Sequence, residues 1–224
     1  MIEAVVFDLD GVLLDSEQVW DSAREQLARE RGGRWHETAQ RDMMGMSSLE
    51  WSRYMHETIG LPEPPDVINA EVVARMAELY RKHLPVLPGA REAVERLAAR
   101  WPLGLASSSN RELIDLVLEE LGVAHLFRAT VSSEEVERGK PAPDVYLEAA
   151  RRLDVDPQLA AAVEDSENGI RAARAAAMEV IAIPNAHFPP GEGALTQADV
   201  VLGSLDELTI EAIEAASGDG AGRG

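Results

Sequence analysis

The chain has 224 residues, of which 46% are apolar, so it is long enough and hydrophobic enough to bury a sizeable core. It carries 40 Asp and Glu residues against 21 Lys and Arg residues, a formal net charge of −19. Nucleic acids and anionic lipid surfaces are bound through clustered basic side chains, so this composition argues against both as partners. The absence of cysteine excludes disulfides, thiolate metal sites and a cysteine nucleophile.

The N-terminal stretch MIEAVVFDLDG lacks the basic region with which a signal peptide begins. No apolar run reaches the roughly 18 residues that a membrane-spanning helix requires. Together with the absence of cysteine, these features lead us to expect a cytoplasmic protein without a membrane partner. A monomer is the default expectation for its assembly.

The first predicted strand is the short apolar run Ile2–Phe7. The following part of the chain has the periodicity of helices, because apolar side chains recur at helical spacing between Val19 and Leu27. Glycines 32 and 33 end that helix. Further helices in this part are expected at Glu37–Met44, Ser47–Thr58 and Asp66–His83.

After Pro85 predicted strands and helices alternate. The strands are expected at Leu103–Ala106, Ala129–Val131, Ala160–Val163, Val180–Ile183 and Asp199–Leu202. The helices are expected at Pro88–Arg100, around Leu113–Leu121, and at Pro143–Leu153, Ser166–Ala177 and Ser204–Ala216. This alternation predicts an α/β fold, a doubly wound, Rossmann-like parallel sheet covered by helices on both faces.

The helical segment interrupts the α/β pattern directly after its first strand. We therefore predict an α/β core domain at residues 1–15 and 84–216, an inserted small α-helical cap domain at 16–83, and a Gly-rich disordered tail at 217–224. Trp20 and Trp51 are expected in the core of the cap. Since ligands of open α/β sheets bind outside the carboxyl ends of the strands, the cap is expected to cover such a site as a lid.

Four turns of the predicted α/β domain carry polar residues. They are Asp8 and Asp10 after the first strand, Ser107 after the second, Lys140 in the GKPAPD turn, and Glu164 and Asp165 after the AAAV strand. Each alone has an ordinary interpretation, because such residues commonly form turns or cap helices. Together they bring carboxylates, a hydroxyl group and a cation to one edge of the sheet.

This combination suits phosphoryl transfer. Carboxylates supply the hard oxygen ligands that Mg²⁺ accepts alongside substrate phosphate. A carboxylate attacking a phosphate meets like-charge repulsion of about 4 kcal/mol per charge pair at about 4 Å and an effective dielectric of about 20, which a metal ion and a lysine can offset. Two acids at i and i+2 share one side of an extended chain, so the second can protonate the leaving alkoxide and then deprotonate water.

Nearly the whole chain, from about Val5 to Leu202, resembles the haloacid dehalogenase superfamily, in its β-phosphoglucomutase-like and sugar-phosphatase branch with a helical cap. Four motifs carry the resemblance in order: DLDGVLLDSE, LASSSN, GKPAPDVY and VEDSENGI. The resemblance implies Mg²⁺ as cofactor, an aspartyl-phosphate intermediate, and a small phosphorylated metabolite, such as a sugar phosphate or phosphoglycolate, as substrate.

The resemblance also implies roles for the motif residues. Asp8 would be the nucleophile and Asp10 the general acid and base. The residues implied to bind phosphate or line its pocket are Ser107, Ser108, Asn110 and Lys140. The implied Mg²⁺ ligands are Asp8, Asp10 through its backbone carbonyl, Asp165 and, as a further ligand, Glu164. The acid at Asp10 favours phosphate esters as substrates, because the dehalogenases of the family differ at this position and do not need the metal.

A hexose phosphate mutase of the β-phosphoglucomutase type is the alternative within the same class. Such mutases carry basic residues around a cap glycine, which Gly45 matches, but no Lys or Arg lies between Asp42 and Trp51. Because holding a distal phosphate needs cations, this stretch favours a phosphatase, although Arg41 or Arg53 could substitute. A non-catalytic phospholigand-binding module is the alternative from another class, and the complete motifs argue against it.

Overall fold

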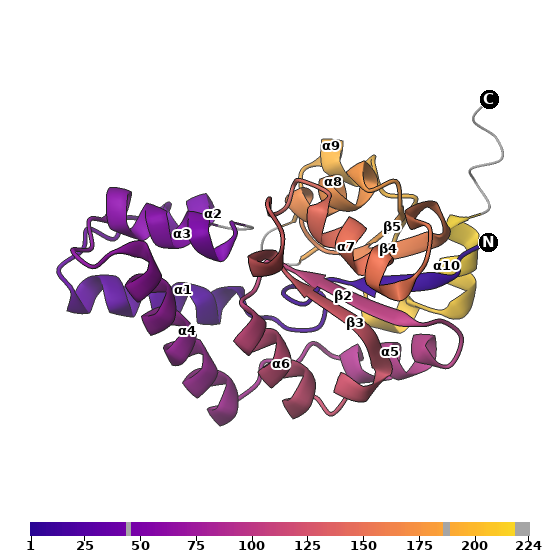
Figure 1. The fold of residues 1–224 in the computed structure, drawn as a ribbon, viewed down its shortest axis with the longest axis horizontal. Helices are drawn as coiled ribbons and strands as arrows, with labels where there is room; N and C mark the ends of the chain where they lie inside the picture. Colours follow the sequence, from indigo (N-terminus) through magenta and orange to yellow (C-terminus); the bar gives the residue numbers. More distant parts are fainter. Residues whose placement is uncertain (44–45, 186–188, 218–224) are drawn as a thin grey trace.

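The computed structural model describes residues 1–43, 46–185 and 189–217 of the chain. Six strands in these residues form one sheet in the order β3-β2-β1-β4-β5-β6, and all of its pairings are parallel. They are β1 (Ala4–Phe7), β2 (Leu103–Ser107), β3 (Phe127–Ser132), β4 (Ala160–Glu164), β5 (Glu179–Ala182) and β6 (Val200–Val201). The predicted doubly wound α/β fold is confirmed, with helices on both faces of the sheet (Figure 1).

The helices form two groups. Four of them follow β1: α1 (Glu17–Glu30), α2 (Ala39–Met43), α3 (Ser48–Tyr54) and α4 (Pro65–Lys82). The others alternate with the later strands: α5 (Ala90–Ala98), α6 (Arg111–Glu120), α7 (Asp144–Leu153), α8 (Glu167–Ala175), α9 (Glu192–Leu195) and α10 (Ile210–Ala216). Figure 1 shows the first group to one side of the sheet, where α1 and α3 both pack on α4. Among the described residues, no helix has the length and apolar character needed to cross a membrane.

Strand β1 separates two hydrophobic cores because its side chains alternate between the faces of the sheet. Ala4 and Val6 belong to a cluster with apolar residues of α7 and α8. Val5 and Phe7 belong to a second cluster with apolar residues of α5, α6 and α10. The second cluster continues into α1, α3 and α4, so the helical group shares a packed interior with one face of the sheet.

The parallel register brings the carboxyl ends of the central strands to one edge. Phe7 is paired with Leu105 on β2 and with Val163 on β4. The next residues along the chain therefore emerge together, and the Asp8 amide donates to the Val163 carbonyl at 3.0 Å. The polar residues that follow β1, β2 and β4 consequently lie at a shared edge, at the point where the strand order reverses.

Several helix boundaries differ from the predicted ones. Helix α3 ends at Tyr54 and continues as a π-helical turn, Met55–Ile59, which Gly60 closes with a φ of 85°. The predicted last helix is split, because Thr209 accepts the Ala212 amide and starts α10 anew after a short 3₁₀ turn. Helix α9 lies in a stretch for which no helix was predicted.

Two expectations about the organisation of the chain stay predictions. The division into a core domain and a cap domain at residues 16 and 83 is one of them. The other is the disordered tail, of which residues 218–224 lie outside the described residues.

The tight packing of α8 on the sheet gives a first prediction. Ala173 is fully buried in the cluster beneath α8, whereas Ala175 is exposed on the same helix. We expect Ala173→Leu to destabilise the protein by about 1–3 kcal/mol, because three added carbons have no space in a packed interior. Ala175→Leu should leave the free energy of unfolding nearly unchanged. Urea unfolding of both variants measures the difference, and equal stabilities would show that α8 is not packed as described.

Candidate active site

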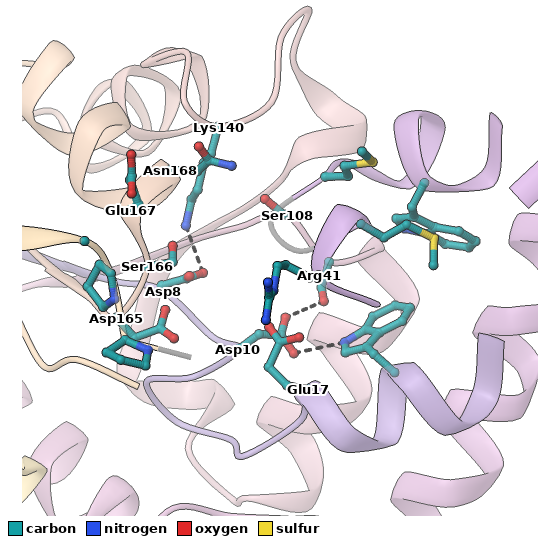
Figure 2. A pocket seen from close by; sticks show the side chains of 18 of the residues that line it. Asp8, Asp10, Glu17, Arg41, Ser108, Lys140, Asp165, Ser166, Glu167 and Asn168 are labelled. Atoms are coloured by element: carbon teal, nitrogen blue, oxygen red, sulfur yellow. Dashed lines mark hydrogen bonds and ion pairs between the residues drawn. The ribbon is translucent and has the colours of Figure 1, made fainter. Parts of the chain in front are cut away.

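A cavity of about 620 Å³ lies between the carboxyl edge of the sheet and the helical group. Its wall on the sheet side includes Asp8, Asp10, Ser108, Ser109, Lys140 and Asp165. Its opposite wall includes Glu17, Trp20, Arg24, Arg41, Met43, Met46 and Trp51. Figure 2 shows the labelled carboxylates and Lys140 directed into the same space.

Asp8 lies at the bottom of this cavity with only 7% of its surface exposed. Its Oδ1 accepts the Leu9 amide at 2.7 Å and lies 3.0 Å from the Nζ of Lys140. Burial, followed by the nearby charge of Glu164, raises the pKa of Asp8 to about 8, although Lys140 opposes this shift. Among the described residues no hydrogen bond reaches the other carboxylate oxygen, Oδ2, so Asp8 has one anchored oxygen and one available oxygen.

Lys140 is a buried cation held between two acids. Its Nζ lies 3.0 Å from Asp8 and 2.6 Å from Glu164, and it stands 5.1 Å from the ring centroid of Tyr146. Burial alone would lower the pKa of Lys140, but the two carboxylates outweigh it, and the pKa is raised. The lysine is therefore charged at neutral pH, and its position is fixed by both neighbours.

Glu164 is fully buried and satisfied by four donors. Lys140 and the Tyr146 hydroxyl donate to its Oε1, at 2.6 and 2.5 Å. The Asp165 amide and the Ser166 hydroxyl donate to its Oε2. Gly169 packs so closely on this carboxylate that an added Cβ would lie 1.9 Å from it. The first turn of α8 thus needs a glycine to make room for the buried acid.

Three carboxylates lie close together at the carboxyl edge of the sheet, with Lys140 as their neighbouring cation. Asp8, Glu164 and Asp165 each offer one oxygen, and these oxygens lie within 4.8 Å of one another. Burial and the charges of Glu164 and Asp8 raise the pKa of Asp165 well above its usual range. Gly11 leaves the space that Asp165 occupies, because an added Cβ would lie 1.9 Å from its Oδ2. This excess of buried negative charge and these hard oxygen donors fit a divalent cation such as Mg²⁺.

Asp10 links the sheet edge to the helical group. Its Oδ2 accepts the Ser109 hydroxyl at 2.6 Å, from the loop after β2. Its Oδ1 accepts the Ser16 hydroxyl at 2.5 Å and the Trp20 indole N–H at 3.2 Å, both at the beginning of α1. The dashed lines around Asp10 in Figure 2 mark the contacts with Ser109 and Trp20. Three donors from two regions of the chain therefore orient this carboxylate toward the cavity.

The loop after β2 places only part of the SSSN run in the cavity. Ser108 and Ser109 line it, whereas Ser107 is fully buried and its hydroxyl accepts the Ser109 amide at 3.0 Å. Asn110 does not line the cavity; its side-chain amide donates to Glu134 at 2.6 Å and to Asn69 at 3.1 Å. The predicted phosphate-binding roles of Ser107 and Asn110 stay predictions, and Ser109 joins Ser108 as a cavity residue.

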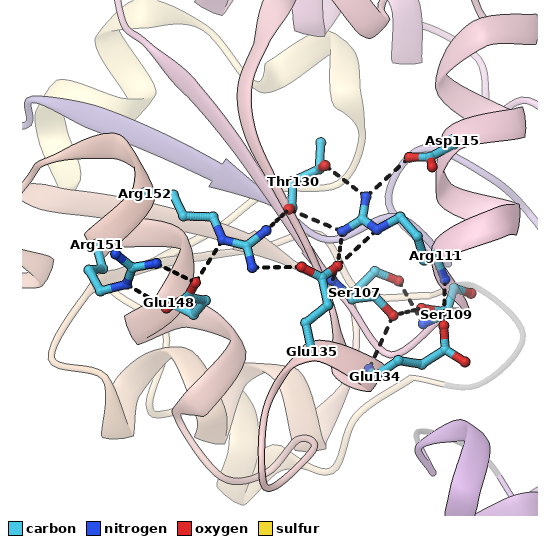
Figure 3. Close-up of polar contacts among 11 residues, drawn as sticks. Ser107, Ser109, Arg111, Asp115, Thr130, Glu134, Glu135, Glu148, Arg151 and Arg152 are labelled. Atoms are coloured by element: carbon cyan, nitrogen blue, oxygen red, sulfur yellow. Dashed lines mark hydrogen bonds and ion pairs between the residues drawn. The ribbon is translucent and has the colours of Figure 1, made fainter.

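A charged network on the far side of this loop holds it in place. Figure 3 shows Glu135 between the guanidinium groups of Arg111 and Arg152, and both arginines also reach Thr130 on β3. Glu134, next to Glu135, accepts the Arg111 amide at 2.8 Å as well as the Asn110 side chain. The loops that follow β2 and β3 are thereby fastened to each other, so the network fixes the backbone on which Ser108 and Ser109 stand.

Sequence reasoning missed several residues of the site. Tyr146 follows Lys140 by six positions in the GKPAPDVY motif, so a helix start between them could have placed the hydroxyl near the lysine. Trp20 was expected in the cap core; it is buried there, and it also lines the cavity. Arg24 shares a helix face with Trp20, and this spacing was the available signal.

Burial perturbs the two charged residues of α1 that line the cavity. It raises the pKa of Glu17 to about 7, and the nearby Asp10 adds to the shift. It lowers the pKa of Arg24 to about 10. Arg24, on the wall formed by the helical group, is therefore largely shielded from water.

The chain is similar in sequence to a family of hydrolases and to several phosphatases. Residues 2–177 match the family of haloacid dehalogenase-like hydrolases. The chain is 36% identical to hexitol phosphatase B of Escherichia coli (strain K12) over 214 residues, 94% of this chain and 96% of that protein. It is 32% identical to a phosphorylated carbohydrates phosphatase of Thermotoga maritima over 182 residues, 80% of this chain and 84% of that protein.

A solved structure shares the whole architecture. The β-phosphoglucomutase of Clostridium difficile superposes with a TM-score of 0.85 at 25% identity, covering all of both chains. The four sequence motifs, the sheet order and these matches agree with one another. The chain belongs to the haloacid dehalogenase-like hydrolases, in the β-phosphoglucomutase-like branch of that superfamily, and it is a phosphatase.

Proposed function

We propose that this protein is a Mg²⁺-dependent phosphomonoesterase that transfers the phosphoryl group of a small phosphorylated sugar or sugar alcohol to Asp8 and then to water. The observation that carries the proposal is the arrangement around Asp8. One oxygen is anchored by Lys140 at 3.0 Å, and the carboxylate lines a cavity together with Asp10 and Asp165.

In the first step Asp8 attacks the phosphorus atom and the ester oxygen leaves. Two anions must approach each other, and their repulsion is about 4 kcal/mol per charge pair at about 4 Å with an effective dielectric of about 20. Lys140 lowers this barrier because its charged Nζ already lies beside the attacking carboxylate. Hydroxyl groups of Ser108 and Ser109 are in the lining and available to phosphate oxygens.

The proposed metal ligands are Asp8, Asp165, the backbone carbonyl of Asp10 and Glu164. Bound there, Mg²⁺ supplies positive charge to the phosphate oxygens and to the developing negative charge of the transfer. Glu164 already receives four hydrogen bonds, so it also serves to hold Lys140 in line with Asp8.

Asp10 is the proposed proton carrier. It gives a proton to the leaving alkoxide and, once the product has left, takes one from the water that attacks the aspartyl-phosphate. The hydrogen bonds from Ser109 and Trp20 hold it on the cavity wall, two positions beyond the nucleophile. Since Ser16 and Trp20 belong to the helical group, the proposed cap orients the acid as well as covering the site.

The relatives and the cavity support the substrate class. The two phosphatases compared above are named for hexitols and for phosphorylated carbohydrates. A cavity of about 620 Å³ has room for a hexose phosphate beneath the helical wall. Phosphoglycolate would leave much of that space unfilled.

A β-phosphoglucomutase-type reaction is the second candidate, favoured by the structural likeness to a β-phosphoglucomutase. The sequence argument against it considered only the stretch between Asp42 and Trp51, in which Gly45 lies outside the described residues. Arg24 and Arg41 line the cavity from other parts of the helical group, whereas Arg53 is exposed and does not. The preference for hydrolysis therefore rests on the phosphatase relatives and on the acids Glu17 and Asp10 near Arg24.

The nucleophile gives the first test of the proposal. Asp8→Asn should fold normally and lose turnover of p-nitrophenyl phosphate with Mg²⁺ by about 10³-fold or more, because an amide is a poor nucleophile. The matched control is Asp15→Asn, an acid of the same segment that does not line the cavity. Full activity of purified Asp8→Asn would remove the assignment.

The second test separates proton transfer from metal binding. Asp10→Asn should lower kcat by about 10²–10⁴-fold, the range of general acid–base catalysis. Mg²⁺ should still raise its melting temperature, because the backbone carbonyl remains and a ligand that binds the native state stabilises it. Asp8→Asn should show a smaller Mg²⁺-induced rise. Equal loss of the rise in both variants would show that the two roles are wrongly divided.

The third test concerns the acceptor of the phosphoryl group. We expect free phosphate to appear as fast as the phosphoester disappears, because water takes the group from Asp8. β-Glucose 1-phosphate should not become glucose 6-phosphate, even when glucose 1,6-bisphosphate is added. A coupled assay that follows both products in one tube decides this. Faster accumulation of glucose 6-phosphate than of phosphate would establish the mutase instead.

A further inference from the structure

Arg24 is a buried cation on α1 that the proposed mechanism does not use. Only 6% of its surface is exposed, yet it lines the cavity. Its guanidinium carbon lies 4.7 Å from the ring centroid of Trp20 and 4.9 Å from that of Trp51. The two indoles, whose ring centroids are 6.0 Å apart, belong to α1 and α3. The group is thus held by aromatic contacts from two helices.

The Nε of this guanidinium lacks the acceptor that a buried N–H group needs. Among the described residues the guanidinium makes no hydrogen bond and no ion pair, and its Nε is buried without any acceptor. Buried charged and polar groups are normally hydrogen-bonded, because leaving them unpaired costs free energy. The aromatic contacts position Arg24 but cannot accept all of its N–H groups, so the missing acceptors point to a ligand in the cavity.

The charges around Arg24 indicate what kind of ligand fits. Glu17 and Asp10 lie close enough to influence its pKa, and both line the same cavity. Two carboxyl groups already lie near the guanidinium, so this part of the wall disfavours a further anion. An arginine only donates hydrogen bonds and a carboxylate only accepts them, whereas a hydroxyl does both. Neighbouring hydroxyl groups of one molecule can therefore satisfy Arg24 and Glu17 together.

Apart from Arg41, the rest of this wall is apolar. Trp20, Met43, Met46 and Trp51 line it beside the two charged groups. Aromatic and thioether side chains pack well against C–H groups. A wall with donors at Arg24 and Arg41, an acceptor at Glu17 and apolar surface beside them matches a carbon chain that carries several hydroxyls.

We propose that Arg24, positioned by Trp20 and Trp51 and acting with Glu17, is the residue that selects the leaving group, and that it selects an uncharged polyhydroxylated one. The inference rests on the proposed phosphatase reaction. It adds which part of the substrate the wall of the helical group binds. Arg24 donates to hydroxyl oxygens of the sugar or sugar alcohol, and Glu17 accepts from its hydroxyl protons. The phosphate itself stays with the residues around Asp8.

The test compares kcat/KM for glucitol 6-phosphate, glucose 6-phosphate, phosphoglycolate and p-nitrophenyl phosphate, all with Mg²⁺. Arg24→Met keeps an unbranched stem as far as the position of Nε and removes the charge and the donors. It should lower kcat/KM for the two polyhydroxylated substrates by about 10- to 100-fold, the effect of losing hydrogen bonds from a charged group. Turnover of p-nitrophenyl phosphate, whose leaving group has no free hydroxyl, reports any effect of the change on Asp10 through Trp20, so it should fall clearly less than turnover of the two polyhydroxylated substrates.

Two further variants guard the interpretation. Arg24→Lys keeps the charge but loses the planar arrangement of donors. Its kcat/KM for the two polyhydroxylated substrates should therefore lie between the values of wild type and Arg24→Met. If Arg24→Met does not fold, Arg24→Lys replaces it in the comparison. Arg29→Met is the matched control, because Arg29 lies on the same helix, is exposed and pairs with Glu25. It should match wild type on every substrate. Thermal unfolding verifies that each variant is folded.

Each remaining outcome contradicts the inference in a distinguishable way. An equal loss on all four substrates would make Arg24 a packing residue, and no loss on any would remove it from the site. Preferred turnover of phosphoglycolate that depends on Arg24 would show that the guanidinium binds a carboxylate. Wild-type turnover of p-nitrophenyl phosphate without turnover of either polyhydroxylated substrate would overturn the inference alone. No wild-type turnover of any substrate would overturn the proposed function as well.

Discussion

The interaction on which the rest of the site depends is the contact of Lys140 with Asp8 and Glu164. A buried lysine is tolerated only when it is paired, and here two carboxylates raise its pKa against the effect of burial. The pairing leaves an excess of negative charge, because Asp165 joins the two acids at the same edge. A divalent cation bound there would offset the excess negative charge. The same cation would therefore serve the proposed chemistry and stabilise this edge of the sheet.

The helical group adds a second constraint, because it reaches the acid that the proposed mechanism uses for proton transfer. Ser16 and Trp20 donate to Asp10, while Ser109 donates from the opposite wall. Movement of the helical group relative to the sheet would break or reform these bonds, so substrate entry and proton transfer share the same contacts. Trp20 also packs against Arg24. The same indole therefore contacts both Asp10, the proposed acid, and Arg24, which is proposed to bind the leaving group.

The fold could be predicted from the sequence because each strand is a short apolar run bounded by turn residues, and the six predicted strands all occur. Asp8 could be placed at the carboxyl edge because it directly follows a strand, whereas Lys140 lies beyond β3 and before α7, so its position beside Asp8 was indicated by the GKPAPDVY motif of the resemblance. The stacking of Arg24 could not, because it depends on how α1 and α3 cross. Asn110 likewise faces Glu134, a partner 24 positions away that no local pattern indicates.

The central claim is that the phosphoryl group is carried by Asp8. The most direct measurement is an acid quench during steady-state turnover of a ³²P-labelled hexitol phosphate, followed by borohydride reduction and peptide mass spectrometry. The account predicts covalent ³²P on the N-terminal peptide and conversion of residue 8 to homoserine after reduction. Turnover without any protein-bound phosphate, or a reduced residue at another position, would contradict it.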